Sequence, residues 1–336
     1  MIKVAHLYRT LGFLLLVMEV SFAQLDFPVT TSALQKINPS IHGMNLSSKA
    51  GLLFSNFNYG DGLSSENNYM YGNIAFQNLN FSIGVDVNSF SLNQLGLKKN
   101  DIKLTYVYKL QLGFESYFLG GLDLGIASQT VDPGALIFQD QLNLQLGTVL
   151  SSSIDPLARI KPSTNYFDVG VSGLIYTEKF LVGVHLGHIN TPNVSFNKES
   201  EIKKDMSFSA LGAFEFEVNP YGRGILPENT YFFGTVYGIS QGESLRVVST
   251  QELQLSNFSV GLMQSLFRFN ESSSTELGLL TSLSFDKFLF NLSYSFNSDT
   301  TSYNTPSIFE IGLRFSFDRF SQNRRGVYKR LNIYNL

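Results

Sequence analysis

Hydrophobic and polar residues alternate with a period of two along most of this chain. Near the C-terminal end, one face of a strand carries Phe309, Ile311, Leu313, Phe315 and Phe317, and the other carries Glu310, Gly312, Arg314 and Ser316. The same alternation runs through 102–111, 208–218 and 288–297. Strands that have lipid on one side and a polar lumen on the other show this pattern.

Turn residues divide the chain into fourteen such segments. They cover 48–58, 67–77, 79–90, 101–111, 113–128, 165–177, 180–189, 205–218, 229–240, 243–255, 256–269, 273–285, 287–297 and 307–317. A soluble β-sandwich also alternates, but its strands usually run about 5–6 residues, whereas a strand that crosses a membrane needs about 9–11. Many of the segments end in Tyr or Phe, as strands do at a membrane interface. We therefore predict an all-β fold, a transmembrane antiparallel outer-membrane β-barrel of about 14 strands.

The connections fit this topology. An even strand number returns both termini to the periplasm, where turns are short, while outer loops are longer. The expected periplasmic turns 77–79 and 177–179 are short, and the expected outer loops 129–164 and 190–204 are long. The periplasmic connection 219–228 is an exception, because it is also long.

The segment 129–164 leaves an alternative open. Its leucines at 142, 144 and 146 alternate with polar residues at 143 and 145, which is compatible with a further hairpin and sixteen strands. Loops of this length are otherwise usually functional. We favour a loop that folds partly over or into the barrel.

The N-terminus has the features of a secretory signal peptide. Lys3 and Arg9 precede a mostly apolar stretch over 11–20, and small residues stand at Ser21 and Ala23, the two positions read by signal peptidase. We expect cleavage after Ala23. The predicted organisation is a signal peptide over 1–23, an N-terminal periplasmic segment over 24–47, the β-barrel over 48–317 and a basic periplasmic tail over 318–336.

Composition agrees with export to a membrane. The chain has 30 Phe and 16 Tyr, and charged residues make up 15%, against about 25% in soluble domains. After residue 24, no stretch approaches the ~20 apolar residues that a spanning helix needs. Removal of Lys3, Arg9 and Glu19 with the signal peptide lowers the 24 basic and 27 acidic residues to 22 and 26, a net charge of −4. This balance does not indicate nucleic-acid binding.

Residues with catalytic chemistry are sparse. There is no Cys, and His185 and His188 stand three apart on a predicted strand, so their side chains should point to opposite faces. They are then poorly placed to share a metal. Ser172 and Ser195 lie near His185 in the sequence, but no motif supports a nucleophile and base pair. We expect no catalytic, cofactor-binding or metal-binding residues, and we do not expect an enzyme.

Three segments carry a family resemblance. The first is Ile37-Asn38-Pro39-Ser40-Ile41-His42-Gly43, which resembles the "INPAYAG"-like opening of the PorP/SprF family. The second runs from Phe167 to Pro192 and resembles the family's "G…Y…yvGlSv.hl..P" segment. The third is the ending with Ser307 and Glu310-Ile311, which resembles the family's last strands. The matching positions, whose role the resemblance leaves unknown, are Asn38, Pro39, Gly43, Gly170, Tyr176, Gly183, Pro192 and Glu310.

The resemblance implies a type IX secretion system membrane protein of the Bacteroidota. Such a barrel would assist the secretion or surface anchoring of a large client protein, for example a gliding adhesin, by binding it at the outer face. The expected partners are outer-membrane lipid, the client, and components of the secretion machinery. The outer loops 129–164 and 190–204 would hold the client, and the basic tail would contact the machinery.

Other functions remain open from the sequence. A passive or substrate-specific channel of porin or fatty-acid-transporter type would have an open lumen or one gated by an N-terminal plug. Residues 24–47 are short for a plug but long enough to enter the lumen in part. A purely structural barrel would leave the outer loops without a partner.

Overall fold

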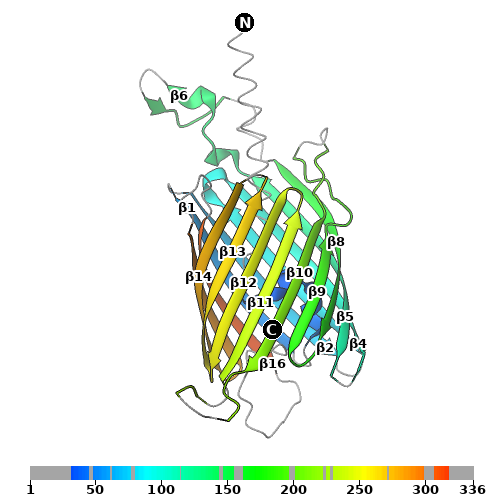
Figure 1. Ribbon diagram of the computed structural model, residues 1–336. Helices are drawn as coiled ribbons and strands as arrows, with labels where there is room; N and C mark the ends of the chain where they lie inside the picture. Colours follow the sequence, from blue (N-terminus) through cyan, green and yellow to red (C-terminus); the bar gives the residue numbers. More distant parts are fainter. Residues whose placement is uncertain are drawn as a thin grey trace.

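In the computed structural model, the chain forms a closed antiparallel barrel of fourteen strands (Figure 1). The structure describes residues 32–44, 48–60, 63–76, 80–113, 115–143, 147–154, 162–196, 201–221, 225–227, 230–270, 272–298 and 306–317. The expected signal peptide, its cleavage site and the basic tail lie outside the described residues. Among the described residues, no helix is long and apolar enough to cross a membrane.

Each barrel strand pairs with its neighbours in the sequence, and the first pairs with the last. The strands are β1 (Ser48–Gly60), β2 (Leu63–Phe76), β3 (Phe81–Leu92), β4 (Leu97–Gln111), β5 (Tyr117–Val131), β8 (Ser163–Tyr176), β9 (Phe180–Gly187), β10 (Ser207–Glu217), β11 (Thr230–Gln241), β12 (Ser244–Leu255), β13 (Phe258–Phe269), β14 (Ser272–Phe285), β15 (Phe288–Asn297) and β16 (Ser307–Phe317). Pairing of Ser48 with Phe317 closes the ring. The predicted barrel of about 14 strands is confirmed.

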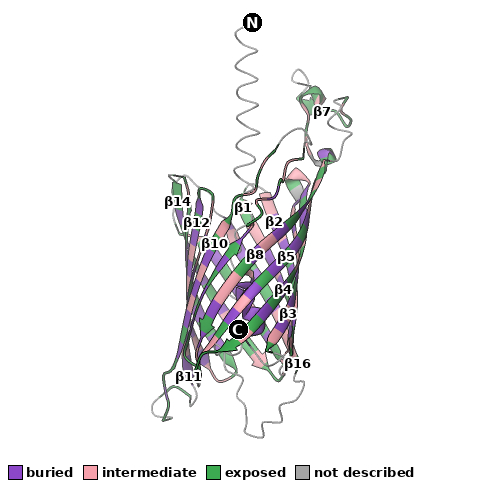
Figure 2. Ribbon diagram, turned by 90° about the vertical axis from the view of Figure 1, so that its right-hand side faces the viewer, coloured by how far each residue is buried: buried purple, intermediate pink, exposed green. Residues whose placement is uncertain are grey.

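The alternation predicted from the sequence is the alternation of the barrel wall. On β4, Ile102 and Leu104 face outwards and are at least half exposed, while Thr105 and Val107 face inwards and are fully buried. On β16, Phe309 and Ile311 face outwards and Glu310 is buried. Figure 2 shows exposed and buried residues alternating along the strands. An apolar outer surface of this kind is stable against lipid.

The lumen is not uniformly polar. Inward-facing side chains of β4, β5 and β8–β14 form an apolar core, which includes Val107, Leu119, Leu181, Phe233 and Phe267. Within it, Arg246 on β12 and Glu276 on β14 form a buried ion pair, with 3.1 Å between Nη1 and Oε2. The arginine also lies over the ring of Phe267.

Replacement of this arginine should destabilise the barrel. Arg246→Met leaves the buried Glu276 without its ion-pair partner, and breaking a buried pair in this way costs about 3–5 kcal/mol. Urea unfolding in lipid vesicles measures the loss. The double variant Arg246→Met/Glu276→Leu should recover most of the free energy of unfolding, and equal losses in both variants would contradict this explanation.

The two ends of the barrel differ. One end, here the terminal end, carries the start of β1, the end of β16 and the turn between β8 and β9. The opposite end, the loop end, carries the segments between β5 and β8 and between β9 and β10. The segment between β5 and β8 contains the short turns η4 (Pro133–Ala135) and η5 (Gln139–Gln141) and a separate hairpin, β6 (Leu142–Asn143) with β7 (Thr148–Val149).

This hairpin corrects one expectation. Both views show the described part of the segment projecting beyond the loop end, away from the lumen (Figures 1 and 2). It therefore neither folds into the barrel nor adds strands to it. The apolar leucine at 142 pairs within the hairpin, with Val149, and the hairpin remains a two-stranded sheet of its own.

Residues 32–44 lie inside the barrel, visible in blue between the strands of Figure 1. This segment, here the plug, has two short 3-10 turns, η1 (Leu34–Lys36) and η2 (Pro39–Gly43). Leu34, Ile37, Ile41 and Met44 pack into the apolar core of the lumen. For these residues the expected periplasmic placement of the segment is wrong. Inside the barrel, their apolar side chains are buried against the inward-facing apolar residues of the wall.

Candidate functional site

Asn38 anchors the plug to the wall. Its Nδ2 donates to the backbone oxygens of Gly173 on β8 and Val184 on β9, each at 3.1 Å. Its Oδ1 accepts a hydrogen bond from the backbone nitrogen of Ser40 at 3.0 Å. An Asn cap followed by Pro at the first position is a favourable start for a helical turn. The Asn-Pro pair of the sequence motif therefore both starts η2 and binds it to two strands.

Gly183 allows this close contact. A Cβ atom at this position would lie 2.5 Å from Asn38 Nδ2 and 3.1 Å from the backbone oxygen of Gly173. At the other end of η2, a Cβ on Gly43 would lie 2.5 Å from Val107 Cγ1. Both glycines are needed because backbone and wall approach too closely for a side chain.

Tyr176 holds the end of the plug. Its hydroxyl donates to the backbone oxygen of Met44 at 3.1 Å, and its ring is fully buried. Glu310 contacts the beginning of the plug, since it accepts hydrogen bonds from Ser32 at 3.4 Å and from Ser55 at 3.2 Å. The plug is thus tied to β16 at one end and to β8 at the other.

The motif positions therefore meet at one place. Asn38, Pro39, Gly43, Tyr176, Gly183 and Glu310, although distant in sequence, all lie where the plug contacts the wall. Gly170 lies beside Asp123, where a Cβ would be 2.4 Å from a carboxylate oxygen. Pro192 is apart from the others, in the segment after β9, and its backbone oxygen accepts from the nitrogen of Lys204.

Further plug contacts were not among the predicted residues. His42 Nε2 is 2.9 Å from Asp86 Oδ2, and the hydroxyl of Tyr69 donates to the other oxygen of this carboxylate. Asn73 donates to the backbone oxygen of His42 at 3.0 Å. His42 lies within the first motif, so the sequence offered a reason to select it. Nothing in the sequence distinguished Asp86, Tyr69 and Asn73, because polar residues are expected at many lumen-facing positions.

A cavity lies between the plug and the loop end. Its volume is about 160 Å³. The charged and imidazole groups in its lining are Lys36, Asp86, Lys99, Asp101, Lys103, Asp168, His185, His188 and Lys204. On the other side of the plug, the space beside Lys49 and Arg314 is only about 10 Å³. Residues 32–44 therefore separate this polar cavity, here the vestibule, from the small space beside Lys49 and Arg314.

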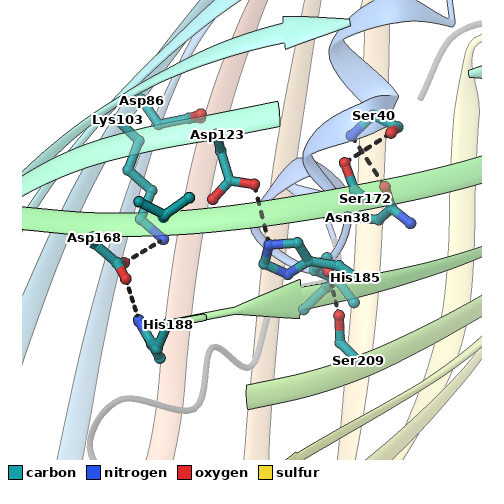
Figure 3. Close-up of polar contacts among 12 residues, drawn as sticks. Asn38, Ser40, Asp86, Lys103, Asp123, Asp168, Ser172, His185, His188 and Ser209 are labelled. Atoms are coloured by element: carbon teal, nitrogen blue, oxygen red, sulfur yellow. Dashed lines mark hydrogen bonds and ion pairs between the residues drawn. The ribbon is translucent and has the colours of Figure 1, made fainter. Parts of the chain in front are cut away.

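The two histidines of β9 and the following segment face the same lumen, contrary to the prediction. His185 Nε2 is 3.3 Å from Asp123 Oδ1, and His188 Nδ1 is 2.7 Å from Asp168 Oδ1 (Figure 3). The strand ends at Gly187, and His188 has a φ of 56°. This left-handed conformation turns its side chain inwards, which a strand repeat does not predict.

The protonation of His188 follows from its position at the wall of the vestibule. Burial, with the positive charge of Lys204 as the next cause, lowers the pKa of His188 to about 4. The ring is therefore neutral at pH 7 and its Nδ1–H donates to Asp168. Lys103 Nζ lies 3.5 Å from the same carboxylate group, so Asp168 joins two strands and the segment after β9.

Two serines were considered as nucleophiles, Ser172 and Ser195. Ser195 lies in the segment after β9, where its backbone nitrogen donates to Asn193 Oδ1 at 3.0 Å, and Ser172 contacts the plug, as does Ser209 of β10. Ser172 Oγ is 2.8 Å from Ser40 Oγ, and Ser209 donates to the backbone oxygen of Ile37 at 2.6 Å (Figure 3). Both hydroxyls therefore hold the plug. In the described part of the chain, no group of three or more His, Cys, Asp or Glu side chains is arranged to hold a metal ion. The chemistry of the site is that of a docked segment beneath a charged vestibule.

Solved structures similar to this chain are bacterial outer-membrane proteins. A FadL homologue from Pseudomonas aeruginosa matches with a TM-score of 0.45 and 8% identity, over 86% of this chain and 93% of that chain. BamA from Haemophilus ducreyi lacking POTRA domains 1–3 matches with a TM-score of 0.42 and 8% identity, over 81% and 70%. The KdgM porin matches with a TM-score of 0.36 and 8% identity, over 80% and 99%.

Comparison with curated protein sequences found no match. The sequence model of one family, described as type IX secretion system membrane protein PorP/SprF, matches residues 18–315. This range includes the plug and the whole barrel wall except the last two residues of β16. The resemblance drawn from the three motifs is confirmed, and the chain belongs to the PorP/SprF family of type IX secretion system membrane proteins.

Proposed function

We propose that this outer-membrane barrel holds a large client protein at the cell surface during its secretion or anchoring by the type IX system. The observation that carries the proposal is the contrast between the two ends. The plug occupies part of the lumen, whereas a segment with exposed apolar side chains projects beyond the loop end. A lumen that holds a docked segment suits a barrel that presents a surface better than one that conducts a solute.

The projecting segment has the character of a binding surface. Ile137, Leu142, Val149, Leu150 and Ile154 are all exposed, and Ile154 is 82% exposed. A group of exposed apolar side chains on an otherwise polar loop is a common mark of a protein interaction site. The loop end faces the cell exterior if both barrel termini lie in the periplasm, as an even number of strands implies.

Binding should depend on these apolar side chains. Replacement of the five residues by Ser, with the loop length unchanged, is expected to reduce the amount of captured client at least about tenfold. A pull-down of the tagged chain from gently solubilised outer membranes, followed by mass spectrometry, measures it. The matched control replaces the exposed Ser151 and Ser152 of the same loop by Ala and should capture as much as the wild type.

The outcomes separate the candidate functions. Recovery of a large surface protein, together with type IX machinery, from the wild type and the control supports the client-holding role. Equal capture by all three proteins would contradict a role for the loop. A barrel that purifies alone and conducts ions would favour the channel instead.

The machinery contact is a separate part of the proposal. We expect the basic tail over 318–336 to bind an acidic periplasmic component, because it carries Arg319, Arg324, Arg325, Lys329 and Arg330. Truncation after residue 317 should remove the machinery components from the pull-down while the client remains.

The family suggests that the client is a gliding adhesin.

A further inference from the structure

β9 is much shorter than the strands beside it. It has 8 residues, whereas β8 has 14. The pairing of β8 with β9 covers Val171 to Tyr176 only. Residues 163–170 of β8 therefore extend towards the loop end past the top of β9. On their other side they remain fully paired with β5.

Part of this extension is capped by the segment that follows β9. Ile189 donates its backbone N–H to the oxygen of Val169, and the side chain of Asn190 accepts from Val169 and donates to the oxygen of Phe167. The side-chain amide of Asn190 thus makes the two hydrogen bonds to β8 that one further residue of β9 would make. His188 causes the departure, since its left-handed backbone turns the chain out of the sheet.

Above Asn190, none of the strands that the structure describes pairs with this edge of β8. In an antiparallel strand, the N–H and C=O of one residue point to the same side, and successive residues alternate. Val169 points towards β9, so Phe167, Asn165 and Ser163 point to that side too. Within the described part of the chain, no hydrogen bond reaches the N–H groups of these three residues or the oxygens of Asn165 and Ser163. All three residues are exposed.

Such an edge is a template for another strand. Its donors and acceptors recur at every second residue, about 6.6–6.8 Å apart, which is the repeat of an extended chain. A free edge of this kind binds a peptide by adding it to the sheet, with affinity from the main chain. Proteins usually protect exposed edges with Pro, charges or a bulge. Here, Pro162 ends the edge and no charged residue stands at 163, 165 or 167.

The place of the edge indicates the occupant. It lies at the loop end, at the start of the strand that follows the projecting segment in the sequence. In Figure 2, the hairpin of β6 and β7 lies beyond this end of β8, so a client bound to the projecting segment would be on the same side of the barrel as the edge. We propose that an extended segment of the client, roughly five residues long, pairs with Ser163–Phe167 as an additional strand. This inference rests on the proposed client-holding function and specifies its mode of binding.

The test compares two substitutions at one position. Asn165→Pro removes an edge N–H and places a ring where the added strand would lie, while the ladder to β5 stays intact because Asn165 does not point towards β5. Pro is tolerated at edge positions whose N–H faces solvent. Asn165→Thr loses the same side chain but keeps the N–H. The probe is the surface protein that co-purifies with the tagged wild-type barrel.

We expect Asn165→Pro to lower the captured client at least about tenfold and Asn165→Thr to change it less than about twofold. Equal capture by Asn165→Pro and the wild type would overturn the added strand and leave the client-holding function standing. Absence of any client from the wild type would overturn both. A drop in oligomer size with Asn165→Pro, at unchanged client capture, would assign the edge to a second copy of the chain and also overturn the inference.

A second measurement does not depend on the folding of a variant. In the wild-type barrel alone, the amides of Ser163, Asn165 and Phe167 should exchange with deuterium rapidly, while those of the alternate residues bonded to β5 are protected. In the purified complex with the client, exchange at the three edge amides should slow at least about tenfold. Unchanged exchange at these amides would overturn the proposal.

Discussion

Deletion of residues 32–44 is expected to turn the closed barrel into an ion-conducting pore. The plug places four buried apolar side chains, Leu34, Ile37, Ile41 and Met44, in the lumen, and the space beside Lys49 and Arg314 on its other side is only about 10 Å³. Without it, the vestibule of about 160 Å³ would connect with the terminal end. Barrels with only slightly more strands enclose aqueous channels.

Planar-bilayer recording is the measurement, with the wild type as the non-conducting reference. The deletion also exposes apolar wall residues such as Leu119 and Phe233 to water. Each buried apolar side chain of the plug stabilises the fold by about 1.5–3 kcal/mol, so the open barrel should also unfold at a lower urea concentration. Discrete conductance steps of similar size from the wild type would contradict the closed lumen and favour the channel function.

Gly183→Ala should loosen the plug without removing it. The added methyl group would lie 2.5 Å from Asn38 Nδ2 and 3.1 Å from the backbone oxygen of Gly173, and that backbone belongs to a paired strand and cannot move aside. Asn38 then loses both hydrogen bonds to the wall. Two such bonds contribute about 1–3 kcal/mol, so the undocked population should rise about tenfold or more.

A single introduced thiol reports on docking, because the chain contains no Cys. Ser40→Cys places it at a position that is fully buried in the docked plug. Its reaction with a water-soluble maleimide should be at least about tenfold faster in Gly183→Ala than in the unchanged background. The matched control is Gly238→Ala, where the nearest atoms to the new methyl group are 3.8 Å away. Equal rates in all three proteins would mean that Gly183 does not govern docking.

The outer surface of the barrel could be predicted because lipid imposes a strict repeat. Every second residue in the lipid-facing part of a spanning strand must be apolar. Ile102 and Leu104 on β4 and Phe309 and Ile311 on β16 follow this rule. The lumen imposes no such repeat. Asp86 contacts the plug and Asp101 lines the vestibule. From the sequence pattern, however, both are identified only as polar residues that face the lumen. The position of the plug thus required three-dimensional structure.

The motif residues show a further limit. The family resemblance selected Asn38, Gly183 and Glu310, but it gave them no role, because the contacts between plug and wall join segments separated by 135 or more positions in the sequence. The histidines show a different limit. Side-chain direction was inferred from strand periodicity, and one left-handed residue, His188, was sufficient to reverse it.

The order of plug and wall along the chain has a consequence for biogenesis. The plug precedes β1, yet it bonds to Glu310 on β16, the last strand, across a separation of 278 residues. A contact of such long range cannot form until nearly all of the wall has been synthesised and positioned. The bond between Ser32 and Glu310 therefore forms only in a chain whose last strand has arrived beside its first. Complete docking of the plug is therefore a late event in assembly, because the contact at its first residue requires the last strand.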